Sequence, residues 1–568
     1  MKLIKYARAL LLMLFAAACN EKFLEVEPTD TITEQKLPTK EGIEGSLVAT
    51  YAVLTGRLYD VFTGSTNWWW GSVMGGDANK GTDPGDGAAL NALQRFETLS
   101  TSNFPLVKYQ ASYEGIVRAN TTLAFLAKAS EPISEDDQKR IAGEARFLRG
   151  HYYFELKKIF NNTPYLDENT IDAVVKNTVD LWPKIEADFQ FAYERLPEKQ
   201  TDAGRANKWA AGAYLAKAYL FQKKYKEAKS LFDEVIAKGV TSRGQKYDLT
   251  EKYSDLFRAA TSDGNKETLF AIESAVNTGS QANASPDLIL NNPYGSGLPV
   301  GCCGYNQPSF DLVNSFRTDD RGLPFLLDGS YNSQEKEVRS DMGRLAADPF
   351  TPDAGNLDPR LDHSVGRRGI PYLNWGVHPG RSWIRNQVFG GPYSPKKFVI
   401  AKGDIADRSG WNPLSGNNFP LIRFADVLLM AAEAEVEEGT LEKAREYVNR
   451  VRKRAQNNAD FVKMDNGAWA AKYVIGLYDA WPGKAVAREA VRFERKLELS
   501  GEGHRFFDLV RWGAAKQAMD AYLANEAKKL PLAFSGAVFT ANKSEYQPIP
   551  QSEIDIVGAE NLIQNPGY

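Results

Sequence analysis

The residues best suited to chemistry in this chain are aromatic side chains that stand beside amide and carboxylate groups. Three consecutive tryptophans, Trp68, Trp69 and Trp70, precede Asp77 and Asn79 in a glycine-rich stretch. Sugar rings present apolar CH faces and hydroxyl edges, which aromatic rings and polar side chains can bind. Successive side chains of an extended chain point to opposite sides, so we expect at least one indole to face solvent or a groove. The alternative is that the indoles clamp the loop onto the fold.

A second stretch rich in glycine and proline holds more aromatic side chains that no helical period explains. The further carbohydrate-binding candidates are Tyr294, Tyr305, Asn306, Tyr372, Trp375 and Trp383. Loops carried on a rigid scaffold are a common place for binding residues.

The first stretch also has a weak metal-binding pattern. The spacing of Asp77, Asn79 and Asp83 faintly resembles a calcium loop, but the glycine and the bidentate glutamate of an EF-hand are misplaced. The preferred interpretation is that Asp77 and Asn79 cap turns or bind sugar hydroxyls. We therefore expect no cofactor, with one structural calcium ion as the weaker alternative.

Cysteine usage indicates export. Cys19 follows an N-terminal segment with three cations and a ten-residue apolar run that ends in small residues, which is typical of a secretory signal. The run is too short to span a bilayer, which takes about 20 residues. The other cysteines are the neighbours Cys302 and Cys303. In an oxidising compartment they could form a vicinal disulfide; the alternative is a pair of reduced thiols.

Composition and motifs exclude several classes of function. The net charge of −3 provides no overall basic field, so we expect no nucleic-acid partner. Hydrophobic residues at 43% and charged residues at 25% are typical of a globular protein. The chain has no HExxH motif, nucleophile elbow, phosphate loop or dinucleotide fingerprint. The absence of these motifs argues against the enzyme classes that carry them, and a binding protein rather than an enzyme is what the family resemblance described below implies.

Helical periodicity defines the elements that must position these loops. Apolar residues recur at three- and four-residue steps over about 105–240 and 420–530. Ala216 and Ala228 lie twelve residues apart, as do Ala432 and Ala444, and this spacing resembles tetratricopeptide helix pairs. The predicted fold is mainly α: a helical scaffold with loop-rich insertions at about 60–105 and 240–420.

Short motifs along the chain resemble one family. They are FLEVEPT at 23–29, YEGIVRAN at 113–120, GEARFLR at 143–149, PLIRFADVLLM at 420–430, ERKLEL at 494–499, GHRFFDLVRWG at 503–513, PIPQSEI at 548–554 and NPGY at 565–568. Together, and in this order, they resemble the SusD/RagB family of outer-membrane nutrient-binding lipoproteins. We expect the charged residues of these motifs to form structural ion pairs between helices.

The resemblance implies a location, a partner and a task. Residues 1–18 would be a lipoprotein signal peptide, 19–45 a tether lipidated at Cys19, and 46–568 a single SusD-like domain. The protein would face outward on the outer membrane, capture oligosaccharide and deliver it to a SusC-like TonB-dependent transporter. Two alternatives remain open. One is a surface glycoside hydrolase, which needs two carboxylates roughly 5–10 Å apart. The other is a repeat scaffold that binds peptide or protein, as in RagB-like peptide uptake.

Overall fold

The computed structural model describes residues 37–568 except 58–60, 173, 285, 296–297, 299–301, 327–328, 405 and 410–412. The predicted signal peptide, Cys19 and most of the tether therefore lie outside the described residues. Helices make up 46% and strands 7% of the structure, which confirms the mainly α prediction. Within the described ranges, no helix is both long and apolar enough to cross a bilayer.

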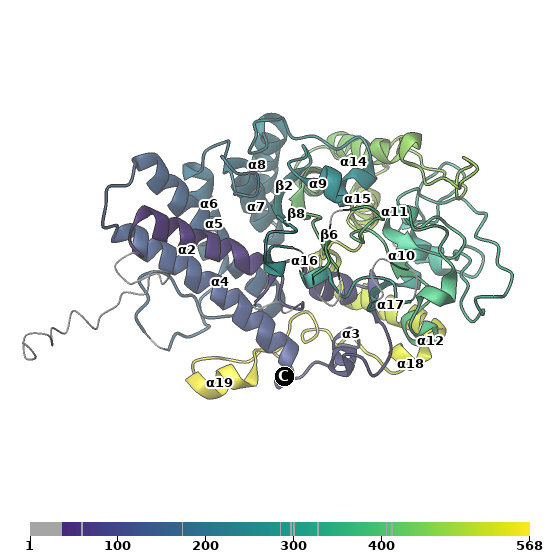
Figure 1. Ribbon diagram of the computed structural model, residues 1–568, viewed down its shortest axis with the longest axis horizontal. Helices are drawn as coiled ribbons and strands as arrows, with labels where there is room; N and C mark the ends of the chain where they lie inside the picture. Colours follow the sequence, from purple (N-terminus) through teal and green to yellow (C-terminus); the bar gives the residue numbers. More distant parts are fainter. Residues whose placement is uncertain are drawn as a thin grey trace, which may run out of the picture.

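The N-terminal half is a stack of consecutive helices, on the left in Figure 1. They are α2 (Lys40–Ala52), α4 (Asn103–Ala127), α5 (Glu135–Phe160), α6 (Trp182–Arg195), α7 (Lys208–Phe221) and α8 (Tyr225–Lys238). Side-chain caps begin several of them: Thr39 accepts from Gly42 N–H, Ser134 from Asp137 N–H and Asn207 from Ala210 N–H. Each helix from α4 to α8 packs on the next one.

A second helical set follows the long insertion. Its members are α13 (Phe424–Glu438), α14 (Leu441–Ala455), α15 (Lys484–Glu498), α16 (Arg505–Arg511), α17 (Ala515–Lys529), α18 (Pro531–Phe534) and α19 (Gln551–Val557). Helix α13 packs on α8 as well as on α14 and α15, which joins the two sets. Ala216, Ala228, Ala432 and Ala444 are all fully buried in the α7–α8 and α13–α14 pairs, as the tetratricopeptide-like spacing predicts.

Four small antiparallel strand pairs tie the loops together. They are β1 (Ala78–Gly81) with β3 (Tyr305–Pro308), β2 (Thr268–Ile272) with β8 (Phe419–Arg423), β4 (Val365–Gly366) with β5 (Ser394–Pro395), and β6 (Ala406–Asp407) with β7 (Leu414–Ser415). The insertions also hold the short helices α3 (Asn91–Gln94), α9 (Ala259–Ser262), α10 (Phe310–Ser315), α11 (Leu361–Ser364) and α12 (Gln387–Gly390). The β1–β3 pair places the first insertion directly beside the second.

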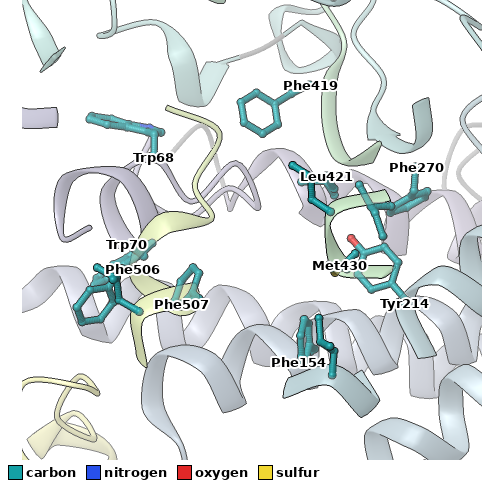
Figure 2. Packing of buried hydrophobic residues seen from close by; sticks show 14 of the residues in the cluster. Trp68, Trp70, Phe154, Tyr214, Phe270, Phe419, Leu421, Met430, Phe506 and Phe507 are labelled. Atoms are coloured by element: carbon teal, nitrogen blue, oxygen red, sulfur yellow. The ribbon is translucent and has the colours of Figure 1, made fainter. Parts of the chain in front are cut away.

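The three consecutive tryptophans belong to the core, so the prediction that one of them faces solvent or a groove is wrong. Trp68, Trp69 and Trp70 are only 2%, 1% and 2% exposed. They begin a π-helical turn, Trp68–Val73, rather than an extended segment, so their rings fan around an axis. Trp70 lies next to Phe506, whereas Trp68 lies apart from it (Figure 2). A Cβ on Gly71 would lie 1.8 Å from the carbonyl oxygen of Gly503, which shows how closely this turn meets the 503–513 motif.

Charged residues of the family-like motifs form buried ion pairs, as the sequence predicts. Arg423 is 1% exposed and binds three carboxylates, those of Glu267 at 2.8 Å, Glu498 at 2.6 Å and Glu502 at 2.8 Å. Arg511 binds Asp508 at 2.8 Å in the same way. These charges are matched inside the protein, so they position helices rather than contact a ligand.

Candidate functional site

Contacts join segments of the two insertions around the candidate aromatic residues. Arg385 contacts Asp83 and the Tyr294 ring, and Trp375 packs against the cluster of Tyr372, Trp383 and Val399. We call these joined segments the loop face and define it by residues 80–86, 291–295, 302–306, 371–385 and 399–404. Tyr294 is 38% exposed and Trp375 is half-buried. Tyr305, Tyr372 and Trp383 are buried at 3%, 0% and 8% exposure. The structure thus corrects the role of these three rings, which support the loop face from below.

Arg385 contacts several segments of the loop face. Its Nε lies 2.7 Å from Asp83 Oδ2 and its Nη1 lies 2.5 Å from Asp86 Oδ2. The Nη1 group also donates to Thr82 Oγ1 at 3.0 Å. On its other side, the guanidinium lies 5.1 Å from the centroid of the Tyr294 ring, within the range of a cation–π contact. One side chain therefore connects both insertions with an exposed aromatic ring.

The 80–86 turn is held in shape from within. The buried Lys80 Nζ donates to the carbonyl oxygens of Asp83 at 3.0 Å and Asp86 at 2.7 Å. Burial lowers the pKa of Lys80 to about 8, against the opposing carboxylates of Asp86 and Asp83. Burial acts to raise the pKa of Asp83, but the N–H groups of Asp86 and Gly85 and the Arg385 guanidinium outweigh it and lower that pKa. Asp83 is therefore a carboxylate at neutral pH.

Trp375 lies on a separate hairpin that is equally well fixed. Pro371 and Val377 pair as antiparallel partners, and the indole Nε1 donates to the Ile400 carbonyl at 3.0 Å. Asn374 holds the backbone of Lys402 from both sides: its Nδ2 donates to the Lys402 carbonyl at 2.6 Å and its Oδ1 accepts from the Lys402 N–H at 2.5 Å. The Lys402 Nζ lies 5.9 Å from the indole centroid.

Cys302 and Cys303 lie directly under this surface. Their Sγ atoms are bonded to each other, and the oxidation of this pair in solution stays a prediction. The following residue, Gly304, accepts a hydrogen bond from the Thr82 N–H at 2.6 Å. A Cβ on Gly304 would lie 3.5 Å from the Tyr294 Cβ and 3.8 Å from the Arg385 Cβ. The 302–304 turn therefore supports the residues that form the exposed cluster.

Asp77 and Asn79 are 1% exposed and connect β1 to the C-terminal part of the chain, so the structure does not place them where they could bind sugar. Asp77 Oδ2 accepts from the Gly501 N–H at 3.0 Å, and Asn79 Oδ1 accepts from the Tyr522 hydroxyl at 2.9 Å. Burial raises the pKa of Asp77 to about 6, with the Gly501 N–H acting against it. Asn306, by contrast, is half-buried and stays a candidate.

The calcium alternative finds no support in the described structure. Asp83 pairs with Arg385, whereas Asp77 and Asn79 bind groups in the C-terminal part of the chain. Among the residues whose positions are given, no group of three or more His, Cys, Asp or Glu side chains could hold a metal ion.

A cavity with a volume of about 880 Å³ lies elsewhere, against α2, α4 and β2. Several of its charged residues are paired: Glu114 binds Arg57 at 2.8 Å and Arg118 at 2.5 Å, and Arg205 binds Glu144 at 3.3 Å. Desolvation raises the pKa of Glu273, another lining residue, to about 7, and Asn418 Nδ2 donates a hydrogen bond to its Oε2. Tyr51 is the one aromatic residue among its described lining residues. The loop face is the better candidate for sugars, because it combines exposed rings with polar groups at their edges.

Comparison with known proteins agrees with the motifs found in the sequence. Residues 266–568, more than half of the chain, match the model described as the SusD family. The chain belongs to the SusD family. Residues 22–220 of this SusD-family chain match a second model, described as starch-binding and associating with the outer membrane.

Relatives extend over nearly the whole length. The chain is 26% identical to a SusD-like protein, P2, of Formosa agariphila, over 98% of both proteins. A crystal structure of a SusD superfamily protein from Bacteroides vulgatus superimposes with a TM-score of 0.67 at 21% identity, covering 93% of this chain and 99% of that one. Surface glycan-binding protein A from Bacteroides thetaiotaomicron, in complex with laminarihexaose, superimposes with a TM-score of 0.63 at 20% identity and the same coverage. These likenesses confirm the SusD-like fold.

Sequence reasoning missed Arg385 and Lys402. Each is a single charged residue in a loop, without a motif or period that marks it. Arg385 stands two residues after the candidate Trp383, which was the nearest available signal. Its importance comes from Asp83 and Asp86 in the other insertion, and that proximity exists only in the folded chain.

Proposed function

We propose that this SusD-family protein binds glycans on the loop face. The observation that carries the proposal is the exposed Tyr294 ring beside the Arg385–Asp83–Asp86 cluster. A second accessible ring, Trp375, packs against the cluster of Tyr372, Trp383 and Val399, and the Trp383 carbonyl accepts a hydrogen bond from the Tyr294 N–H. The rings would stack on the CH faces of sugar units, and the guanidinium and carboxylates would bind hydroxyl groups. The glycan complex of the Bacteroides thetaiotaomicron neighbour and the starch-binding family model support this assignment.

The loop face favours binding over hydrolysis. A glycosidase needs one carboxyl group that stays protonated near neutral pH to act as the general acid. Asp83 has a lowered pKa and Asp86 is paired with the same arginine, so this pair would not supply that acid. Among the carboxyl groups with raised pKa values, Asp77 and Glu526 are buried at 1% and 0% exposure, and Glu273 lies in the cavity against α2, α4 and β2 rather than on the loop face. Peptide uptake remains the second candidate, on family resemblance alone.

The same proposal includes an outer-membrane location and a transporter partner. Cys19 would be lipidated, hold the protein at the outer face of the membrane and let it deliver glycan to a SusC-like TonB-dependent transporter. The family model that matches residues 22–220 is described as associating with the outer membrane, which supports the location. Replacing Cys19 by alanine should move the protein from the membrane to the soluble fraction. Unchanged membrane retention would exclude lipidation at this residue.

Binding can be tested by calorimetry and affinity electrophoresis against a panel of polysaccharides, with a reducing-end assay on the same samples. We expect binding without release of reducing ends. Trp375→Ala should weaken binding at least tenfold, which corresponds to about 1.4 kcal/mol. Trp469→Ala is the matched control, because this indole is 50% exposed outside the loop face. Equal losses in both variants, or steady release of reducing ends, would contradict the proposal.

A further inference from the structure

The charges of the loop face are unevenly paired. By sequence, the segments that form it contain four basic residues, Lys80, Arg381, Arg385 and Lys402, and three acidic ones, Asp83, Asp86 and Asp404. Lys80 and Arg385 both act on the Asp83–Asp86 turn, so these four charges balance one another. The remaining charged residues of these segments are Arg381, Lys402 and Asp404.

Asp404 is balanced from inside the protein. Its Oδ2 accepts a hydrogen bond from the Ala401 N–H at 2.8 Å. Burial lowers the pKa of the Arg258 guanidinium, and the nearby Asp404 carboxylate counters that shift. Asp404 thus has both a hydrogen-bond donor and a cation close to it, and it is not a free carboxylate that would neutralise the exposed cations.

Lys402 and Arg381 remain as exposed cations. Within the described ranges, neither side chain has a carboxylate within ion-pair distance. Lys402 stands at the edge of the Trp375 ring, 5.9 Å from Nζ to the indole centroid, and Asn374 fixes its backbone there. Arg381 lies on the turn Gly380–Trp383, where the Gly380 N–H donates to His378 Nδ1 at 3.0 Å and Trp383 packs on His378.

Lys402 therefore stands on a rigid support beside the Trp375 ring, and Arg381 stands on a rigid turn four residues before Arg385, in a protein whose net charge is −3. A neutral sugar unit offers such cations hydroxyl groups only. A carboxylate or a sulfate ester forms charge-assisted hydrogen bonds with them, which are roughly twice as strong as neutral ones. Exposed, unpaired cations at the edge of a stacking ring are suited to a sugar that carries an anionic substituent.

We infer that the ligand of the loop face is an anionic glycan, whose uronate or sulfate groups bind Lys402 and Arg381 while its rings stack on Trp375. This inference rests on the proposed glycan-binding function and names the chemical class of its ligand. Carboxylate and sulfate share the chemistry that the two cations recognise, so the choice between them is left to the test.

The test uses the mature protein in calorimetric titrations with a polyuronate (alginate), a sulfated galactan (carrageenan) and a neutral glucan (laminarin). Each titration is run at about 50 mM and about 500 mM NaCl, since salt screens exposed charges. We expect at least one anionic glycan to bind at least tenfold more tightly than laminarin at low salt, with most of that advantage lost at high salt. The identity of the preferred polymer then separates uronate from sulfate recognition.

The variant Arg381→Gln/Lys402→Gln should lose at least tenfold more affinity for the anionic glycan than for laminarin. The matched control Lys238→Gln/Arg243→Gln removes two cations outside the loop face, whose side chains are 66% and 62% exposed. It should leave affinity unchanged, and thermal melting should confirm that both variants fold. A preference for laminarin, salt-independent affinities or an unaffected double variant would each overturn the inference while glycan binding stands. If the protein binds none of the three glycans, that result would count against the proposed function itself.

Discussion

Arg385 binds Asp83 across the two insertions, with 2.7 Å between Nε and Oδ2, and holds its guanidinium 5.1 Å from the Tyr294 ring centroid. The pair is partly exposed, at 29% and 28% of the two side chains, so it contributes little to global stability. Its importance is local, because it orients the turn and the ring that would contact sugar.

Arg385→Ala should therefore weaken glycan binding at least tenfold while changing the free energy of unfolding by less than about 1 kcal/mol. Calorimetry and denaturant melts on the same samples measure the two effects. Arg321→Ala is the control, since Arg321 pairs with Asp319 at 3.2 Å in an exposed position outside the loop face. A large loss of stability without a loss of affinity would show that Arg385 has only a structural role.

For Arg423 we expect the opposite, a large loss of stability on substitution, since its three carboxylate partners are all buried. Arg423→Ala would leave Glu267, Glu498 and Glu502 without this cation, and breaking such a buried pair costs about 3–5 kcal/mol. Urea unfolding measures the loss. Arg243→Ala is the control, because Arg243 lies 3.5 Å from Asp263 in an exposed pair. This variant should lower the free energy of unfolding by less than about 0.5 kcal/mol. Similar values for both variants would be inconsistent with a stabilising network.

Gly71→Ala tests whether the tryptophan turn is part of the core. The added Cβ would meet the Gly503 carbonyl oxygen at 1.8 Å, so we expect a loss of about 3 kcal/mol from overpacking. Gly45→Ala, in the interior of α2 with no atom within 4 Å of the new Cβ, should instead stabilise the protein by about 0.5–1 kcal/mol. Thermal melts distinguish the two. A neutral Gly71→Ala variant would mean that this turn is less tightly packed than the structure shows.

Glu526 should make stability depend on pH. Burial, together with the Asp311 carboxylate, raises its pKa from 4.5 to about 7. The folded state therefore holds a proton that the unfolded state releases, and this contribution to stability is lost as the pH rises towards 7. The amide in Glu526→Gln does not ionise, so this variant should not show that loss. Its advantage over wild type in free energy of unfolding should therefore grow by about 2 kcal/mol from about pH 5.5 to about pH 8.5. Melting curves of both proteins at these two pH values measure the difference. Parallel pH profiles for wild type and Glu526→Gln would show that ionisation of Glu526 does not destabilise the folded state.

The helical scaffold could be predicted because its evidence is local and repeated. The spacing of the small residues Ala216, Ala228, Ala432 and Ala444 is enough to indicate the close helix pairs. The binding surface could not be predicted in the same way. Trp68, Trp69 and Trp70 suggest an exposed platform when the chain is assumed to be extended, but a π-helical turn and the residues around it bury all three. Nothing within the loops themselves indicates that Arg385 meets Asp83.

Hydrogen exchange with and without saturating oligosaccharide tests whether glycan binds on the loop face, because it locates the bound ligand on the intact protein. We expect slower exchange at residues 80–86, 302–306, 371–385 and 399–404, and no change around the cavity formed by α2, α4 and β2. Protection confined to that cavity, or no protection at the loop face with a ligand that binds, would contradict the account.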